Sequence, residues 1–140
     1  MKDAYPVFIC KSDEDYLVYI PDMDIYTEGT SMVDAIEMAR DAIGLKGVAF
    51  ENDHLPIPQP SNFNTALAKA KLEADEDFNY LSGILTLVDV DFTEYRKRMN
   101  HRAVKKNCTI PYWLCVEAEK EGINFSKVLQ EALMQKMNTK

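Results

Sequence analysis

The sequence predicts an α+β fold in which an N-terminal β-β-β-α-β lobe precedes a C-terminal strand and two helices. Three observations support this class. Aromatic and β-branched runs separated by polar turns fill the first thirty residues, a pattern typical of strands. Apolar residues then recur at helical spacing in "TSMVDAIEMARDAI". Near the end, Pro111 and Gly122 bound one short helix, and Asn124 begins another.

The N-terminal strands are predicted as a hairpin and one further strand. "YPVFICK" and "DYLVYIP" are separated by the polar turn "SDED", and "IYTEG" follows after "PDMD". Thr30 or Ser31 can then cap a helix. Its buried face is predicted to consist of Met32, Ala35, Ile36, Ala39 and Ile43.

The next segments complete the predicted N-terminal lobe. "LPIPQPSN" has prolines at alternate positions, so we expect an extended surface segment. "NTALAKAKLEAD" is a plausible second helix, and "LSGILTLVDVDF" is apolar on both faces, which favours a central strand. "FTEYRKRMN" is expected to be a charged, partly helical connector. We therefore predict domains at 1–95 and 101–140, joined by 96–100.

The charge of the chain is distributed unevenly along the sequence. The formal net charge is -7 over 140 residues, of which 46% are hydrophobic, enough for a packed core. Residues 1–95 carry 6 Lys+Arg against 19 Asp+Glu, giving -13, and residues 96–140 carry 10 against 4, giving +6. An acidic lobe repels nucleic acid and a basic segment attracts it, so the two segments are predicted to differ in function.

Composition also excludes several classes. No uninterrupted apolar run approaches the roughly 18 residues needed to cross a bilayer, and "MKDAYPVFICKSDED" lacks a secretory apolar region, so we expect a cytoplasmic protein. The three cysteines are odd in number and have no CxxC spacing, which argues against a disulfide framework and a zinc site. Reduced, mostly buried thiols are expected.

The C-terminal segment begins with a two-sided strand, "AVKKNCTIP". Alternation places one apolar set and one polar set on opposite faces. The apolar set is Val104, Cys108 and Ile110, and the polar set is Lys105, Asn107 and Thr109. The first helix is "YWLCVEAEKE", and the second is predicted to bury Phe125, Val128, Leu129, Ala132 and Leu133.

This segment is too small to bury its apolar side chains alone, which predicts a homodimer. Pairing the strand with its copy gives a two-stranded antiparallel ribbon that fits the DNA major groove. Lys105, Asn107 and Thr109 are then expected to contact base edges. The free backbone N–H groups near Asn124, Phe125 and Ser126 are predicted to bind a DNA phosphate.

From about Arg102 to Met137 the chain resembles the ribbon-helix-helix family of bacterial repressors. The resemblance rests on the strand alternation, Pro111, Gly122, Asn124 and "FSKVLQEAL". The first helix is about one turn shorter than is usual in that family. The resemblance implies a DNA-binding transcription repressor.

The β-β-β-α-β order, "YLVYIPDMDIYTEGTSMVDAIEMARDAI" and the attached ribbon-helix-helix together resemble a HicB-type antitoxin over nearly the whole chain. In that family the N-terminal lobe is similar to an incomplete ribonuclease H fold. The chain departs from the family at "PDMDIY", where a glycine and often a cysteine are usual. The resemblance implies a partner, HicA, a small basic toxin that cleaves messenger RNA, and repression of the shared operon. Higher assemblies with the toxin are left open.

A lobe with a charge of -13 is suited to a basic RNA-binding partner, because it competes with phosphates for the same positive surface. Asp22, Asp24 and Glu28 are the predicted contacts. A ligand-responsive repressor without a toxin partner is the main alternative.

A Mg²⁺-dependent nuclease is the third hypothesis, because Asp22, Asp24, Asp89 and Asp91 form DxD pairs near strand ends. No nearby histidine base or phosphate loop accompanies these pairs. His54 and His101 are expected to be surface residues. We therefore predict no catalytic residues, metal site or cofactor.

Overall fold

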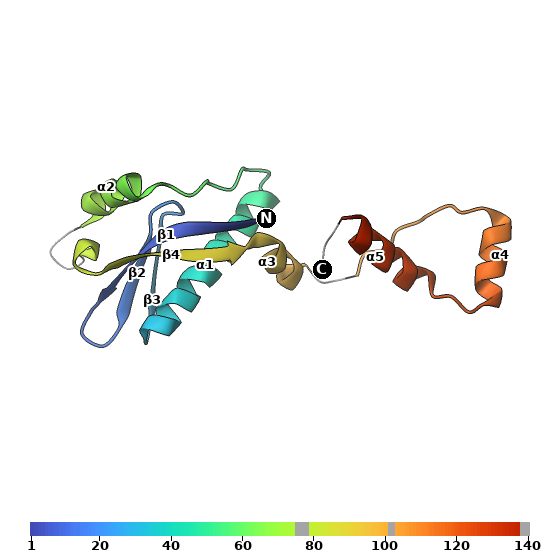
Figure 1. The fold of residues 1–140 in the computed structure, drawn as a ribbon, viewed down its shortest axis with the longest axis horizontal. Helices are drawn as coiled ribbons and strands as arrows, with labels where there is room; N and C mark the ends of the chain where they lie inside the picture. Colours follow the sequence, from blue (N-terminus) through green and yellow to red (C-terminus); the bar gives the residue numbers. More distant parts are fainter. Residues whose placement is uncertain (75–78, 101–102, 138–140) are drawn as a thin grey trace. The chain divides into compact units, whose positions relative to one another are not determined.

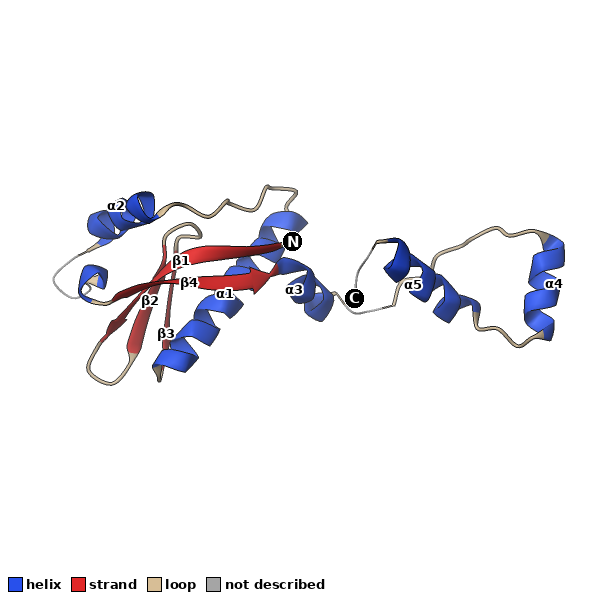
Figure 2. Ribbon diagram, in the orientation of Figure 1, coloured by secondary structure: helices blue, strands red, loops and turns tan. Residues whose placement is uncertain are grey.

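A computed structural model describes residues 1–74, 79–100 and 103–137. Within these ranges it contains an antiparallel four-stranded sheet and helices, so the predicted α+β class is confirmed (Figures 1 and 2). The elements are β1 (Lys2–Lys11), β2 (Tyr16–Ile20), β3 (Ile25–Gly29), α1 (Met32–Asn52), α2 (Phe63–Glu73), the short 3-10 helix η1 (Tyr80–Ser82), β4 (Ile84–Asp91), α3 (Phe92–Met99), α4 (Tyr112–Lys120) and α5 (Phe125–Lys136). Two compact units are present, Met1–Arg102 and Ala103–Lys140, called here the N-terminal and C-terminal units.

The sheet of the N-terminal unit has the strand order β3-β2-β1-β4. β1 and β2 form the predicted hairpin, in which Lys11 lies opposite Tyr16 across the polar turn. β3 pairs with β2, with Tyr26 opposite Tyr19. The predicted hairpin and third strand are therefore confirmed.

Helix α1 covers one face of the sheet, as its apolar spacing predicts (Figure 2). Ser31 is the cap residue, and its hydroxyl accepts a hydrogen bond from the Asp34 backbone N–H at 3.1 Å. Ala35, Ala39 and Ile43 are fully buried against the sheet. This core also contains Tyr5, Val7, Ile9, Val18, Ile20, Val88, Val90 and Phe92.

Helix α2 and η1 cover part of the opposite face. Ala66 and Ala70 of α2 pack with the rings of Phe8, Tyr19 and Tyr80. The proline-rich segment before α2 contains no helix or strand, as predicted. It is held to the sheet by the Tyr5 hydroxyl, which donates a hydrogen bond to the Pro58 carbonyl at 2.7 Å.

Strand β4 lies at an edge of the sheet, so its predicted central position is wrong. Val88 and Val90 are buried toward α1, whereas Ile84 and Leu87 are 53% and 68% exposed. The central position was predicted because β4 has apolar side chains on both faces, a pattern typical of strands inside a sheet. In the described residues, β4 pairs only with β1.

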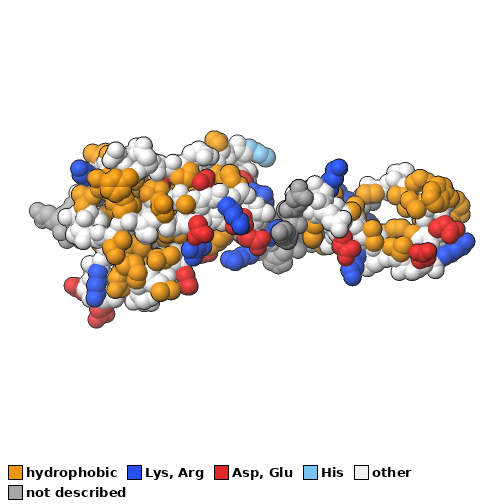
Figure 3. Space-filling view, viewed as in Figure 1, with side chains coloured by type: hydrophobic (Ala, Val, Ile, Leu, Met, Phe, Trp, Pro, Cys, Tyr) orange, Lys and Arg blue, Asp and Glu red, His pale blue; other side chains and the backbone are white. Residues whose placement is uncertain are grey.

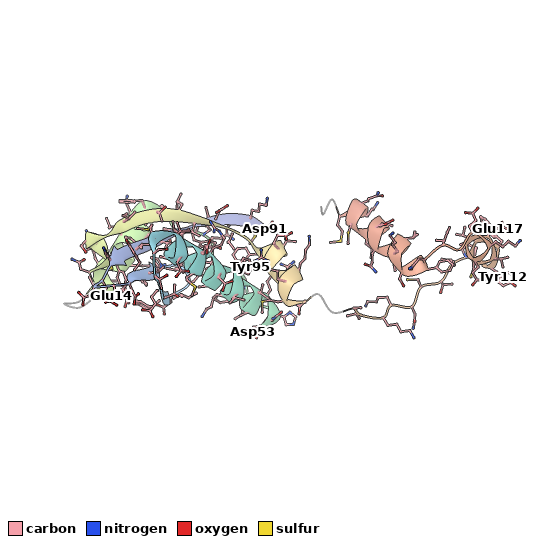
Figure 4. The ribbon with its side chains drawn as sticks, turned by 90° about the horizontal axis from the view of Figure 1, so that it is seen from below. Glu14, Asp53, Asp91, Tyr95, Tyr112 and Glu117 are labelled. Atoms are coloured by element: carbon pink, nitrogen blue, oxygen red, sulfur yellow. The ribbon has the colours of Figure 1, made fainter. Side chains whose placement is uncertain are left out.

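Helix α3 crosses the position at which the sequence predicted a domain boundary, near residue 96. Its Phe92 and Tyr95 are buried, and Figure 4 shows Tyr95 between α3 and α1. Arg96 donates hydrogen bonds to both carboxylate oxygens of Glu51 in α1. Residues 96–99 therefore pack with the N-terminal unit instead of forming a free connector.

This packing changes the charge of each part of the protein. Residues 1–102 carry 10 Lys+Arg against 19 Asp+Glu, giving -9, and residues 103–140 carry 6 against 4, giving +2. Much of the basic surplus assigned to the C-terminal segment thus belongs to α3 and the residues that follow it. The N-terminal unit remains strongly acidic, but the C-terminal unit is only weakly basic.

Replacing Gly47 with Ala tests the packing of α1 against α3. A Cβ atom at Gly47 would overlap the buried Phe92 ring. We expect Gly47→Ala to lower the free energy of unfolding by about 1–3 kcal/mol, despite the higher helix propensity of alanine. Urea unfolding measures the change. Glu37→Ala, on the exposed face of α1, is the control, and equal stability of the two variants would contradict the packing.

Buried tyrosines predict a loss of stability in alkali. Desolvation, with smaller contributions from neighbouring carboxylates, raises the pKa of Tyr5 and of Tyr19 from 10.0 to about 12. The unfolded tyrosines release their protons first, so this stabilisation is complete below pH 10 and is lost as the pH rises toward about 12. We expect Tyr19→Phe to flatten the fall of the melting temperature in that window. Tyr112→Phe, at an 85% exposed ring, is the control, and an equal effect of both variants would contradict this origin.

Candidate functional site

The C-terminal unit has the predicted helices and helix ends. Gly122 has a φ of +67°, the left-handed conformation that favours glycine, and it follows the end of α4. The Asn124 side chain caps α5 by accepting a hydrogen bond from the Lys127 backbone N–H at 3.1 Å. Residues 103–111 form no strand in the single chain, since no neighbouring strand pairs with them. The ribbon between two copies stays a prediction.

The segment 103–111 nevertheless has two distinct sides. Lys106, Cys108 and Ile110 line a cavity of about 310 Å³ together with Phe125 and Leu129 of α5. The lining of this cavity contains none of the alternate residues. Those residues are the predicted base contacts Lys105, Asn107 and Thr109, and all three are exposed. The alternation therefore separates Cys108 and Ile110 from the three predicted base contacts in the single chain.

The apolar side chains of the C-terminal unit surround an open cleft. Its volume is about 400 Å³. It is lined by Cys108, Ile110, Leu114, Ala118, Ile123, Phe125, Val128, Leu129 and Ala132. Figure 3 shows hydrophobic side chains around the hollow between α4, α5 and the extended segment. The segment 103–111 and both helices thus direct apolar groups toward a space that one chain does not fill.

No residue in the described range 103–137 is buried. Val128 and Leu133 of the predicted buried face are 50% and 52% exposed, and Trp113 of α4 is 66% exposed. Figure 4 shows Tyr112 and Glu117 on α4, where Tyr112 is 85% exposed. Burying one such aliphatic or aromatic side chain completely is worth about 1.5–3 kcal/mol. Association that buries these side chains therefore stabilises the unit.

The three predicted partner contacts in the N-terminal unit, Asp22, Asp24 and Glu28, differ in their exposure. The Asp22 side chain is only 2% exposed and forms an ion pair with Lys69 at 3.4 Å. Its carboxylate also accepts hydrogen bonds from the Ser61 backbone N–H, at 2.9 Å, and from the Ser61 hydroxyl. The bonds of Asp22 with Ser61 and Lys69 thus link the turn after β2 to the start of α2. Asp24 and Glu28 are exposed at the two ends of β3.

Tyr26 lies between Asp24 and Glu28 and was missed by the sequence reasoning. Its ring is half exposed and stacks on Tyr19, with 4.9 Å between ring centroids. The Tyr26 hydroxyl donates a hydrogen bond to Glu73 of α2 at 2.7 Å. Asp24, Tyr26, Glu28 and Glu73 form a surface called here the acidic edge. Its sequence signal was "DIYTE", but Glu73 is brought there only by the fold.

The carboxylates proposed for a nuclease do not gather into one site. Asp89 is paired with Arg40, at 3.1 Å, while Asp22 is held by Ser61 on the other side of β1. In the parts of the chain that the structure describes, no three or more His, Cys, Asp or Glu side chains are placed to hold a metal ion together. His54 is exposed, as predicted. His101 lies outside the described residues.

The three thiols are free, but they differ in burial. Cys10 is buried, Cys115 is half-buried and Cys108 is exposed in the single chain. The prediction of mostly buried thiols is therefore correct for Cys10 alone. Among the described residues, no helix has the length and apolar character needed to cross a bilayer.

Comparisons with known proteins agree with this architecture. A family model described as "HicB_like antitoxin of bacterial toxin-antitoxin system" matches residues 5–132. A solved toxin–antitoxin complex from Streptococcus pneumoniae contains a similar chain, with 28% identity, a TM-score of 0.60, and coverage of 97% of this chain and 99% of that one. No curated protein matches the chain.

Two solved antitoxin structures have a similar fold. The antitoxin HicB of Burkholderia pseudomallei is 21% identical, with a TM-score of 0.50 and 97% of each chain covered. The antitoxin HicB3 is 26% identical, with a TM-score of 0.50 and coverage of 95% of this chain and 96% of that chain. The likeness therefore extends over both compact units.

Proposed function

The chain belongs to the HicB-like antitoxin family of bacterial toxin-antitoxin systems, and from this premise we propose that it neutralises a small basic HicA-type toxin and represses its own operon. The two activities are assigned to different units and operate in the cytoplasm. The N-terminal unit binds the toxin, and paired C-terminal units bind operator DNA. The proposal includes no catalytic role, metal or cofactor.

The DNA-binding part of this proposal rests on the apolar side of the C-terminal unit, which a single chain leaves exposed. A second copy of the unit fills the open cleft around Leu114, Phe125 and Leu129. The two segments 103–111 then pair as an antiparallel ribbon, because their backbone groups have no other partner strand. Lys105, Asn107 and Thr109 lie on the side turned away from the cavity lining. They are therefore free to enter the major groove.

The start of α5 supports a second contact with DNA. Asn124 caps the helix, and the exposed residues Phe125 and Ser126 lie in its first turn. Free N–H groups and the helix dipole favour a phosphate at such a position. These groups set the position of the protein on the duplex, while the ribbon reads its sequence. The net charge of +2 in this unit allows approach to DNA despite the acidic N-terminal unit.

The acidic edge is the proposed toxin-binding surface. A toxin that binds messenger RNA must present basic side chains, and Glu28 and Asp24 offer charges that compete with phosphates. Tyr26 adds an exposed ring on which an arginine or lysine can stack. Asp22 keeps an indirect role, because it holds the turn before β3 in place. The net charge of -9 in the N-terminal unit speeds the encounter with a basic protein.

Removing the base contacts tests the ribbon. We expect the double variant Lys105→Ala, Asn107→Ala to bind DNA from upstream of its own gene more weakly by about 1–3 kcal/mol per lost contact, with unchanged toxin binding. A gel-shift titration measures the affinity. Lys120→Ala, which removes one exposed charge from α4, is the control.

Added salt provides a second measure of the same contact. The affinity of the unchanged chain for DNA should fall steeply as salt rises, since lysines displace counterions from phosphates. Unaltered affinity in the double variant, or a flat salt profile, would argue against the ribbon.

Reversing one charge tests the acidic edge. We expect Glu28→Lys to slow association with the basic protein that co-purifies from the native host about tenfold at low salt, and less at high salt. Stopped-flow mixing measures the rate. Glu37→Lys makes the same change of charge on α1, which covers the other face of the sheet from α2. Equal rates for the two variants would refute the assignment, and the absence of any co-purifying basic protein would favour a ligand-responsive repressor.

A further inference from the structure

The sheet of the N-terminal unit ends in two different edge strands. β3 has five residues, with exposed carboxylates at Asp24 and Glu28 on either side of Tyr26. β4 has eight residues, and its first five, Ile84–Val88, carry no charge. Proteins protect an edge from pairing with another strand by making it short or charged. β3 has this protection, whereas β4 lacks it over most of its length.

The unprotected edge is also apolar beside its backbone. Ile84 is 53% exposed, Leu87 is 68% exposed, and Phe63 of the neighbouring α2 is 59% exposed. Pro6, Phe63, Leu85 and Leu87 line part of a groove of about 620 Å³ along β4. Figure 3 shows apolar side chains gathered over the region of β1, β4 and α2. Free backbone groups and an apolar groove together fit a β-strand as the occupant.

The sequence of the edge is nearly symmetrical about Thr86. Ile84-Leu85-Thr86-Leu87-Val88 has the same order of side-chain types in both directions. In an antiparallel pair centred on Thr86, Leu85 lies opposite Leu87 of the second copy. Ile84 then lies opposite Val88 of that copy. Such self-complementarity is what a two-fold contact between identical chains requires.

We propose that β4 pairs with β4 of a second copy of this chain about a two-fold axis through Thr86, which joins two N-terminal units into one continuous sheet. The contact is separate from the C-terminal ribbon and does not depend on DNA or toxin binding. It leaves the acidic edge uncovered, since β3 is the opposite edge of the sheet. A chain with both contacts can form assemblies larger than a dimer.

The lack of charge along Ile84–Val88 favours a second copy over a basic partner at this edge. Two N-terminal units of -9 repel each other, so they can approach closely only through an uncharged stretch. In the proposed register the two Asp89 residues lie about 20 Å apart, from six strand residues at ~3.4 Å each, which exceeds the screening length of about 8–10 Å. A basic partner gains no electrostatic attraction from Ile84–Val88. It gains far more at Glu28 and Asp24.

A cysteine at the symmetry axis tests the pairing in the full chain. Directly opposed strand residues have Cα atoms about 4.5–5.5 Å apart, which suits a disulfide. In a chain carrying Cys108→Ser and Cys115→Ser, we expect Thr86→Cys to form a covalent dimer under mild oxidation on non-reducing gels. Leu72→Cys, at an 85% exposed position of α2, is the control and should remain largely monomeric. Adding Leu87→Lys to Thr86→Cys should reduce the cross-linked fraction about tenfold.

Sedimentation of the full chain without added cysteines gives an independent measurement. Leu87→Lys should lower the mass of the largest assembly at equilibrium, whereas Leu72→Lys should not. Circular dichroism of both variants shows whether the sheet remains folded. Cross-linking of Thr86→Cys no greater than that of Leu72→Cys, or an unchanged mass for Leu87→Lys in a folded protein, would overturn the proposal. Either failure would leave the toxin and DNA assignments intact, because these positions belong to neither surface.

Discussion

The C-terminal unit cannot bury its own apolar side, and this constraint determines how the protein is organised. The N-terminal unit has a sheet covered by α1 on one face and by α2 on part of the other, with Tyr5, Ile43 and Phe92 fully buried. In the C-terminal unit no described residue is buried, although Leu114, Phe125 and Leu129 surround an apolar cleft. Association with a second copy is the direct way to remove that surface from water. The polar side of 103–111 then faces outward as a consequence of strand alternation.

Charge separates the surfaces of the N-terminal unit. The acidic edge at β3 is suited to a basic protein, and the uncharged edge at β4 is suited to a second copy of the same chain. Helix α3 moderates the acidity, because Arg96 pairs with Glu51 and Lys97 pairs with Glu94. One small sheet can therefore support two kinds of contact without competition between them. The contacts differ in their dependence on salt, since salt weakens the attraction at the first and screens the repulsion between two acidic units at the second.

Local patterns in the sequence were sufficient to predict most elements. The alternating runs of β1 to β3, the Ser31 and Asn124 caps, and Gly122 after α4 all depend on residues close together in the chain. Strand order and side-chain partners depend on distant residues. For this reason the sequence did not indicate that β4 is an edge, that α3 packs on α1, or that Ser61 and Lys69 hold Asp22. Tyr26 was missed because its importance comes from Tyr19 and Glu73, which the fold brings beside it.

Hydrogen exchange in residues 103–111 tests the pairing of two C-terminal units most directly. In one chain these amides belong to no strand or helix. The ribbon gives alternate amides a backbone partner, so the account predicts slowed exchange from Lys105 to Thr109 that strengthens with protein concentration and needs neither DNA nor toxin. Exchange at the rate of an unstructured peptide, at concentrations where the full chain is associated, would contradict it.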